Sequence, residues 1–221
     1  MTIVSLKKLT VSYDRVRALD NVTLDIPRGT TLVIGSNGSG KTTLLKVIAG
    51  LVKPSSGVVR VFGLNPYRDF AKVSSRLIFI DDSDPIPYMY RVRHYVELLA
   101  EAYGWDPVRY AVDVLGLQEH LEKRIGELSK GLRRRVSLLE ALAAKSKDLL
   151  LLDEPLAGLD RRNRIAVSNA IRALSKGISV IVASHIPLRA LRFNYLVVLE
   201  SGYLVYSGAF SEQIVHDYLQ I

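Results

Sequence analysis

Hydrophobic and polar positions alternate along the first third of the chain. Residues 2–11 (TIVSLKKLTV) and 18–26 (ALDNVTLDI) have a period of roughly two, which predicts strands with one buried face. Two short apolar runs that end at glycine, residues 30–35 (TTLVIG) and 58–63 (VVRVFG), predict further strands. Between these two runs, residues 42–51 (TTLLKVIAGL) have the spacing of a helix that stops at a glycine.

The middle of the chain changes to helical periodicity. Apolar residues recur at steps of three and four positions in residues 92–104, 107–117 and 132–145. Each of these segments therefore predicts a helix with one apolar face. We expect an all-helical subdomain, residues 84–147, inserted into an α/β core.

The final third returns to an alternation of strands and helices. Residues 148–155 (DLLLLDEP) and 178–185 (ISVIVASH) are predicted buried strands, with a helix between them. Residues 195–208 (YLVVLESGYLVYSG) predict a hairpin that turns at Ser201 and Gly202. Continuous apolar strands that alternate with helices predict an α/β fold, in which a mostly parallel sheet is covered on both faces.

Composition and charge narrow the function only a little. The 221 residues suit one domain, with residues 1–83 and 148–221 as the catalytic core around the helical segment. The net charge of +8 favours anionic partners weakly, and a solvated basic surface explains it equally well. The absence of cysteine excludes disulfides, thiol catalysis and cysteine metal sites. No secretory signal is visible and no apolar run approaches the ~20 residues of a membrane span, so we expect another chain to cross any membrane.

The strongest chemical signal is a glycine-rich stretch. Residues 35–42 (GSNGSGKT) match the pattern G-x-x-x-x-G-K-[ST], in which backbone N–H groups and a helix N-terminus surround a phosphate. Lys41 is expected to reach the β- and γ-phosphates of a nucleotide, and Thr42 to ligate Mg²⁺. A chance turn is the alternative, but this stretch joins an apolar strand to an apolar helix, as phosphate binding requires. The expected nucleotide contacts are Ser36, Asn37, Gly38, Ser39, Gly40, Lys41, Thr42 and Thr43.

Acidic residues end the predicted strand at 149–154. Asp153 and Glu154 stand where the ligand crevice of a parallel sheet opens, and neighbouring strand side chains point in opposite directions. Asp153 is therefore expected to bind the metal and Glu154 to act on an attacking water. The alternative is a structural role, because acidic residues also stabilise helix N-termini by interacting with the helix dipole. His185 ends the next predicted buried strand. It is expected either to contact the γ-phosphate or the water, or to be an ordinary core or surface histidine.

These motifs stand in the order of a known family. The chain resembles the nucleotide-binding subunit of ATP-binding-cassette (ABC) transporters along nearly its whole length. The matching motifs are GSNGSGKTT as the Walker A loop, LSKGL as the signature, LLLLDEP as Walker B, LAGLD ending at Asp160 as the D-loop, and ASH with the switch histidine. Tyr13 occupies the position where the family stacks an aromatic ring on adenine.

The resemblance implies both fold and activity. It implies a P-loop NTPase with a mostly parallel central sheet, an N-terminal antiparallel β subdomain and an inserted all-helical subdomain. It also implies ATP hydrolysis with Mg²⁺, in which Lys41, Glu154 and His185 are catalytic. Two chains, identical or different, would pack head to tail, so that Ser129 and Gly131 of one reach the ATP held by the other.

The resemblance also implies the setting in which the chain works. The expected partners are a second nucleotide-binding subunit and a transmembrane permease, at the cytoplasmic face of the cell membrane, and no nucleic acid is expected. Asp160 of the D-loop is a further expected nucleotide contact.

The arginine tract after the signature needs its own interpretation. Ser129 is expected to cap a helix, Arg133 and Arg134 to be solvated, and Arg135 to be structural. DNA binding is disfavoured because three adjacent arginines spread around a helix and form no stripe.

Two departures from the family pattern matter. Lys130 and Leu132 replace a glycine and the glutamine of the usual LSGGQ, and a lysine at this position occurs in the exporter-like branch. The Q-loop glutamine is replaced by an aspartate. We align Asp82 with it, with Asp81 as the rival, and expect this aspartate to hold Mg²⁺ with altered geometry. A plain acidic turn is the alternative.

Residues 80–105 correspond to the family's docking surface for the membrane subunit. The aromatic and methionine side chains there, which either dock or pack in the core, are Tyr88, Met89, Tyr90 and Tyr95.

The alternatives to a transporter subunit are a soluble single-cassette ABC ATPase, in assembly or a nucleic-acid process, and a small-molecule kinase. LSKG and LAGLD speak against the kinase.

Overall fold

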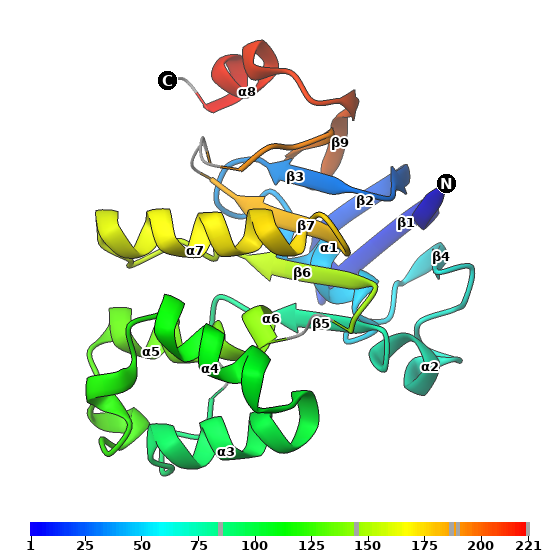
Figure 1. The fold of residues 1–221 in the computed structure, drawn as a ribbon. Helices are drawn as coiled ribbons and strands as arrows, with labels where there is room; N and C mark the ends of the chain where they lie inside the picture. The colour runs from blue at the N-terminus through cyan, green and yellow to red at the C-terminus, as the bar shows by residue number, and fades with distance from the viewer. Residues whose placement is uncertain (84–85, 144–145, 186–187, 189–190, 220–221) are drawn as a thin grey trace.

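Two β-sheets form the framework of the chain (Figure 1). The computed structural model describes residues 1–83, 86–143, 146–185, 188 and 191–219. The smaller sheet has three strands in the order β2-β1-β4, and the larger has six in the order β5-β6-β7-β3-β8-β9. The strands are β1 (Thr2–Tyr13), β2 (Val16–Pro27), β3 (Thr30–Ile34), β4 (Ser56–Val61), β5 (Leu77–Ile80), β6 (Leu149–Asp153), β7 (Ser179–Ser184), β8 (Tyr195–Glu200) and β9 (Tyr203–Ala209).

The pairing of the strands confirms the predicted fold class. All pairs from β5 to β8 are parallel, and only β9 runs antiparallel, to β8. The small sheet is antiparallel throughout. The predicted hairpin is also confirmed, because β8 and β9 pair from Glu200 and Tyr203 outward, around the turn at Ser201 and Gly202.

Helices cover both faces of the larger sheet and extend beyond one edge. Figure 1 shows α3, α4 and α5 grouped beyond β5, and α7 running along the sheet next to β6 and β7. The α-helices are α1 (Lys41–Ile48), α2 (Phe70–Ser74), α3 (Val92–Tyr103), α4 (Trp105–Val114), α5 (Lys130–Ser137), α6 (Leu139–Ala143), α7 (Arg161–Leu174) and α8 (Glu212–Leu219), and two short 3₁₀ turns are Gln118–His120 and Ile125–Glu127. The predicted subdomain start, residue 84, lies outside the described residues, so the subdomain boundaries stay a prediction.

One predicted helix is wrong in its extent. The segment expected to form one helix over residues 132–145 begins earlier, at Lys130, and breaks between α5 and α6 at Leu138. The break follows from a tightened turn, because the Leu138 amide donates to the Arg135 carbonyl three residues back, at 3.2 Å. Residues 144 and 145, the end of the predicted helix, lie outside the described residues.

The core divides according to the pleat of the large sheet. In β6, Leu149 and Leu151 point into a cluster that includes α1 and the small sheet, whereas Leu150 and Leu152 point to the helices on the other face. Every residue of β6 is buried. Because a fully buried leucine side chain stabilises the fold by about 2 kcal/mol, β6 is a firmly anchored element.

This topology brings the sequence motifs together. The strands β6, β7 and β3 are neighbours and parallel, so the segments that follow them emerge at the same edge. These segments are the P-loop, residues 35–42, the Asp153–Glu154 pair and His185. None of the described helices combines the length and apolar character needed to cross a bilayer.

Candidate active site

The P-loop depends on two glycines that no other residue can replace. Gly35 and Gly40 have φ of 155° and 103°. A Cβ on Gly35 would lie 2.2 Å from the Leu199 carbonyl oxygen, and one on Gly40 would lie 2.5 Å from that of Ala18. The loop is therefore packed against β2 and β8 at backbone distance, with the N-terminus of α1 directly behind it.

Lys41 is held inside this loop. Its side chain is buried, and Nζ donates hydrogen bonds to the carbonyl oxygens of Gly35 at 2.8 Å and Ser36 at 2.9 Å. Burial lowers the pKa of Lys41, while the carboxylates of Glu154 and Asp153 act in the opposite direction. The ammonium is thus a partly desolvated cation whose strongest electrostatic neighbours are the two acidic residues of the motif.

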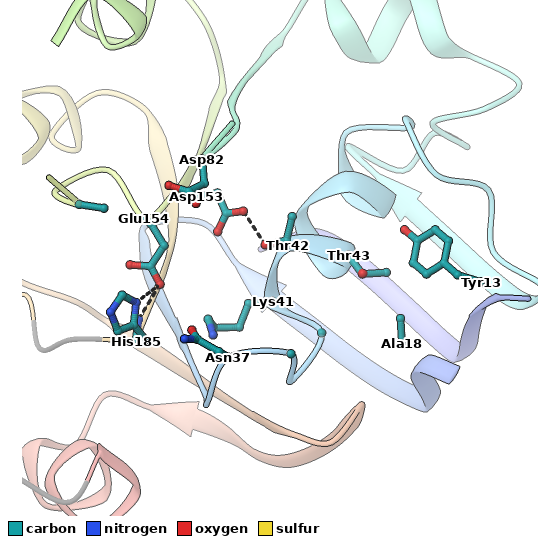
Figure 2. A pocket seen from close by; sticks show the side chains of 13 residues that line it. Tyr13, Ala18, Asn37, Lys41, Thr42, Thr43, Asp82, Asp153, Glu154 and His185 are labelled. Carbon is teal, nitrogen blue, oxygen red and sulfur yellow. Dashed lines mark hydrogen bonds and ion pairs between the residues drawn. The ribbon is translucent and has the colours of Figure 1, made fainter. Parts of the chain in front are cut away.

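A cavity of about 490 Å³ lies beside the P-loop (Figure 2). Tyr13 and Ala18 line one end of it. Glu154 and His185 line the opposite end, and Lys41 lies between. The complete lining is Tyr13, Ala18, Asn37, Gly38, Gly40, Lys41, Thr42, Thr43, Asp82, Asp153, Glu154, Ala157 and His185. The cavity therefore has an aromatic end, a glycine-rich loop that holds the Lys41 ammonium, and an acidic end.

Thr42 and Asp153 meet at the acidic end. The Thr42 hydroxyl donates to Asp153 Oδ2 at 2.6 Å, and Asp153 is 1% exposed. Burial raises the pKa of Asp153; the Thr42 hydrogen bond opposes this, and the charges of Asp81, Glu154 and Asp82 reinforce it. The other oxygen, Oδ1, is buried and accepts no hydrogen bond. A buried, unsatisfied carboxylate oxygen next to a hydroxyl is a place where a cation fits.

The donor set suits Mg²⁺ in particular. Among the described residues, no group of three or more histidine or acidic side chains could hold a metal by itself. Mg²⁺ is commonly held by one or two protein oxygens together with phosphate oxygens and water. Thr42 and Asp153 provide this partial shell, next to the loop that would bear the phosphates.

Glu154 is fixed at both its backbone and its side chain. Its φ is 46°, a region that residues other than glycine seldom occupy, and its amide donates to the Ala183 carbonyl at 2.9 Å. Oε1 accepts from the His185 amide at 2.8 Å and lies 2.6 Å from His185 Nδ1, and Oε2 accepts from the Ser184 hydroxyl at 3.3 Å. Unusual backbone conformations held in this way are concentrated at active sites.

The structure distinguishes the two aspartates of the predicted Q-loop. Asp81 turns away to Lys46 of α1, with Oδ2 3.0 Å from Nζ, and its Oδ1 accepts from the Ser83 amide at 3.1 Å. Asp82 instead lines the cavity, and Figure 2 shows it beside Asp153. The geometry therefore favours Asp82 over Asp81 as the cavity residue, and its role in metal binding stays a prediction.

Several predicted nucleotide contacts lie outside this cavity. Ser129 caps α5 through a 3.3 Å hydrogen bond from the Leu132 amide, as expected, but it is not among the lining residues. The same holds for Gly131 and for Asp160, which caps α7 by accepting from the Asn163 amide at 2.9 Å. Ser36 and Ser39 belong to the P-loop but are also absent from the lining.

The prediction that Arg134 is solvated is wrong. Arg134 is 3% exposed, and its guanidinium donates to the carbonyl oxygens of Asp81 and Glu154 at 2.7 and 2.9 Å, and to that of Asp153. The reason is the position of α5, whose inner face lies against the acidic end of the cavity. Arg135 is structural as expected, with Nη1 3.0 Å from the Leu115 carbonyl oxygen.

The aromatic residues of the expected docking surface divide into two groups. Tyr88, Met89 and Tyr90 are 48%, 78% and 50% exposed. Tyr95 is largely covered and packs against the core. The exposed three are available for a partner, whereas Tyr95 is a core residue.

The sequence did not indicate three residues that shape the site. Ala18 lines the cavity next to Tyr13, Lys46 holds Asp81, and Arg134 holds the backbone around Glu154. A small residue inside a strand gives no signal of its own. Lys46 and Arg134 are charged residues on helices, and neither periodicity nor motif spacing indicates their partners.

Known proteins give an independent view of the chain. The family model described as "ABC transporter" matches residues 19–157. The zinc transport system ATP-binding protein TroB of Treponema pallidum (strain Nichols) is 30% identical over 98% of this chain and 85% of its own length. The ABC transporter ATP-binding protein NatA of Bacillus subtilis (strain 168) is 30% identical over 88% of this chain and 82% of its own length.

A solved structure supports the fold. The dimeric structure of MJ0796, a bacterial ABC transporter cassette, matches with a TM-score of 0.79 and 24% identity, covering 94% of this chain and 99% of the other. The Walker A and Walker B residues, the cavity they line and these similarities agree. The chain therefore belongs to the ABC transporter family of ATP-binding proteins, whose members hydrolyse ATP.

Proposed function

We propose that the chain binds and hydrolyses ATP as the nucleotide-binding subunit of an ABC transporter, and that two subunits close around two ATP molecules to drive a separate membrane permease. The observation that carries the proposal is the convergence of Lys41, Thr42, Asp153 and Glu154 on one cavity with an aromatic end. A cavity of about 490 Å³ is also within the range typical of small-molecule sites.

The binding steps follow from the lining. Tyr13, 46% exposed at one end, offers a ring face on which adenine stacks. The P-loop amides and the N-terminus of α1 donate hydrogen bonds to the phosphate oxygens. Lys41 leaves the carbonyl oxygens of Gly35 and Ser36 and pairs with phosphate oxygens instead, which restores a full ionic partner to a partly desolvated ammonium.

Thr42 and Asp153 would hold Mg²⁺, with Asp82 as a third oxygen donor from the Q-loop position. A bound ion would supply positive charge that neutralises the phosphates. It would also favour the ionised form of Asp153, which burial and three neighbouring carboxylates disfavour.

Glu154 is the proposed base for the attacking water. Its carboxylate lies at the acidic end of the cavity and is oriented by His185 and Ser184. Orientation of the water and neutralisation of charge account for most of the catalysis in phosphoryl transfer. His185 lines the same acidic end of the cavity as Glu154 and is proposed to contact the γ-phosphate.

Dimerisation is supported by what the cavity lacks. The predicted γ-phosphate contacts Ser129 and Gly131 begin α5, which presents amide groups and a helix N-terminus, yet neither residue lines the cavity of its own chain. A second chain packed head to tail would bring its own Ser129 to the open side of the nucleotide. The dimeric state of the MJ0796 cassette is consistent with this arrangement.

The setting of the subunit is inferred from its relatives. TroB is by name the ATP-binding protein of a zinc transport system. By analogy, we infer that this chain works at the cytoplasmic face of the membrane, bound to a permease. The exposed Tyr88, Met89 and Tyr90 are the proposed permease contact. Lys130 in the signature favours an exporter-like system.

Two measurements test this function. ATP turnover by the purified chain should rise more steeply than linearly with protein concentration, because the site is complete only in a dimer. Glu154→Gln should bind ATP and double its mass in light scattering, while Lys41→Ala should do neither. A chain that hydrolyses no ATP, alone or with a co-purified permease, would refute the proposal.

A further inference from the structure

Arg134 occupies a position that its sequence context did not suggest. It lies on α5, three residues after Gly131 of the signature, and its side chain is 3% exposed. We propose that Arg134 is a positioning residue for hydrolysis, which holds the backbone of Glu154 and of Asp81 around the cavity without contacting ATP. This proposal rests on the proposed function, since it concerns the rate of the same reaction.

The guanidinium joins two separate parts of the site. Nη1 donates to the carbonyl oxygen of Asp81, at 2.7 Å, just after β5. Nη2 donates to the carbonyl oxygens of Asp153 and Glu154, the latter at 2.9 Å, at the end of β6. One side chain from the helical region therefore fixes both acidic segments relative to each other, through their backbone carbonyl oxygens.

The contact with Glu154 matters because that residue has an uncommon backbone. Its φ of 46° persists only where the surroundings hold it. The amide of Glu154 donates to the Ala183 carbonyl, and its carbonyl accepts from Arg134 at 2.9 Å and from the Ala157 amide at 3.1 Å. Loss of Arg134 would leave the carbonyl with the Ala157 amide alone, which weakens the hold on the backbone that orients the carboxylate.

Arginine has properties here that other residues do not match. Its planar, permanently charged fork can donate to carbonyl oxygens in several directions at once, whereas a lysine ammonium is a single point on a flexible stem. Its charge also lies among the acidic residues that close the cavity. Arg134 does not line the cavity itself, so it acts through the groups that do.

The contacts also connect the signature to the base. Ser129 caps the helix that carries Arg134, and Arg134 holds Glu154. A displacement of the beginning of α5 is therefore transmitted to the catalytic backbone by one rigid turn of helix and one side chain.

The test compares Arg134→Lys and Arg134→Gln with the wild type, each also combined with Glu154→Gln. Arg133→Gln is the matched control, because Arg133 is adjacent on the same helix and donates instead to the Leu128 carbonyl, at 2.6 Å. The readouts are kcat, KM, the Kd of a non-hydrolysable ATP analogue and the melting temperature. Misplacement of a catalytic group by about 1 Å costs on the order of 100-fold, so Arg134→Gln should lower kcat by roughly 30- to 100-fold and Arg134→Lys by roughly tenfold.

Specific outcomes separate positioning from general damage. The Kd should change less than about threefold in both variants, and the Arg133→Gln control should keep kcat within about threefold of the wild type. In the Glu154→Gln background, loss of Arg134 should lower the residual rate no further, because the two residues act as one unit. If Arg134→Gln fails to fold, Arg134→Lys alone decides.

Three results would overturn the inference. They are wild-type turnover by Arg134→Lys, a loss of kcat matched by an equal loss of affinity, and independent, multiplicative effects of the Arg134 and Glu154 substitutions. If the wild type itself hydrolyses no ATP, the proposed function fails. If ATP hydrolysis depends on Glu154 but is unchanged by substitution of Arg134, only this inference fails.

Discussion

Replacement of Asp153 by asparagine should stabilise the nucleotide-free protein while abolishing its chemistry. Asp153 is 1% exposed, one of its oxygens has no hydrogen-bond partner, and the charges of Asp81, Asp82 and Glu154 add to the cost of keeping it ionised. Asparagine has the same shape, carries no charge and still accepts the hydrogen bond from Thr42. The negative charge that metal binding requires at this position is therefore expected to lower the stability of the nucleotide-free protein.

The magnitude follows from opposing effects. Burial of an unpaired ion costs several kcal/mol. An amide N–H₂ group without a partner costs about 1–3 kcal/mol, and the Lys41 ammonium loses one favourable neighbour. The net gain for Asp153→Asn should be about 1 kcal/mol, which in a chain of this length raises the melting temperature by about 2–4 °C.

The assay is thermal unfolding in EDTA at pH 7.5, followed by circular dichroism. Asp148→Asn is the matched control, because Asp148 precedes the opposite end of β6 and forms a half-exposed ion pair with Arg76, at 2.6 Å. This control should lose at most about 1 kcal/mol. Mg²⁺ with ATP should stabilise the wild type but not Asp153→Asn.

The pH dependence gives the sign of the effect. The pKa of Asp153 in the folded protein is raised above its ordinary value of 3.8. Protonated Asp153 therefore contributes to the stability of the wild type at low pH, and this contribution is lost as the pH rises through the pKa of Asp153 in the folded protein. The advantage of Asp153→Asn should therefore be full at neutral pH and shrink as the pH falls toward 4. A variant that melts below the wild type at pH 7.5 would refute the reasoning.

Three further predictions concern other parts of the chain. Tyr13→Ala should weaken ATP binding by about 5- to 100-fold, since stacking on a base contributes about 1–3 kcal/mol. Tyr218→Ala, the control, changes an exposed tyrosine of α8 that does not line the cavity and should leave the calorimetric Kd unchanged; equal affinities of Tyr13→Ala and the wild type would exclude stacking on Tyr13. Gly131→Ala should reduce ATP-induced dimerisation but not ATP binding, because its Cβ would lie 2.9 Å from the Gly158 carbonyl oxygen of the D-loop, and an undiminished dimer in sedimentation would contradict this. Burial raises the pKa of Tyr95 to about 12, so the contribution of protonated Tyr95 to stability is lost as the pH rises from about 10 through 12. In an alkaline titration, Tyr95→Phe should remove a tyrosinate absorbance change from the late phase and not from the phase near pH 10.

Much of the site could be predicted because its parts are local. An apolar strand, a glycine turn and a helix follow one another within residues 30–48, and each has its own pattern. Asp153 and Glu154 follow a wholly apolar strand, whose burial requires a place inside the sheet. Because parallel strands share one edge for their carboxyl ends, order along the chain was enough to predict that these groups meet.

The rest depends on packing between segments that are distant in sequence. Three adjacent arginines look alike in a sequence, and only the rotation of α5 against β6 decides that Arg134 is buried while Arg133 remains partly exposed. The choice between Asp81 and Asp82 likewise depends on Lys46, on a helix more than thirty residues earlier. Neither periodicity nor motif spacing contains that information.

Glu154, at the acidic end of the cavity, is the residue proposed to activate the water that cleaves ATP. The most direct measurement is a single-turnover assay with radiolabelled ATP and Mg²⁺, in which the nucleotide retained by the protein is separated and identified. The wild type should convert bound ATP to ADP, while Glu154→Gln should retain intact ATP with undiminished affinity. Conversion at the wild-type rate by Glu154→Gln would contradict this proposal.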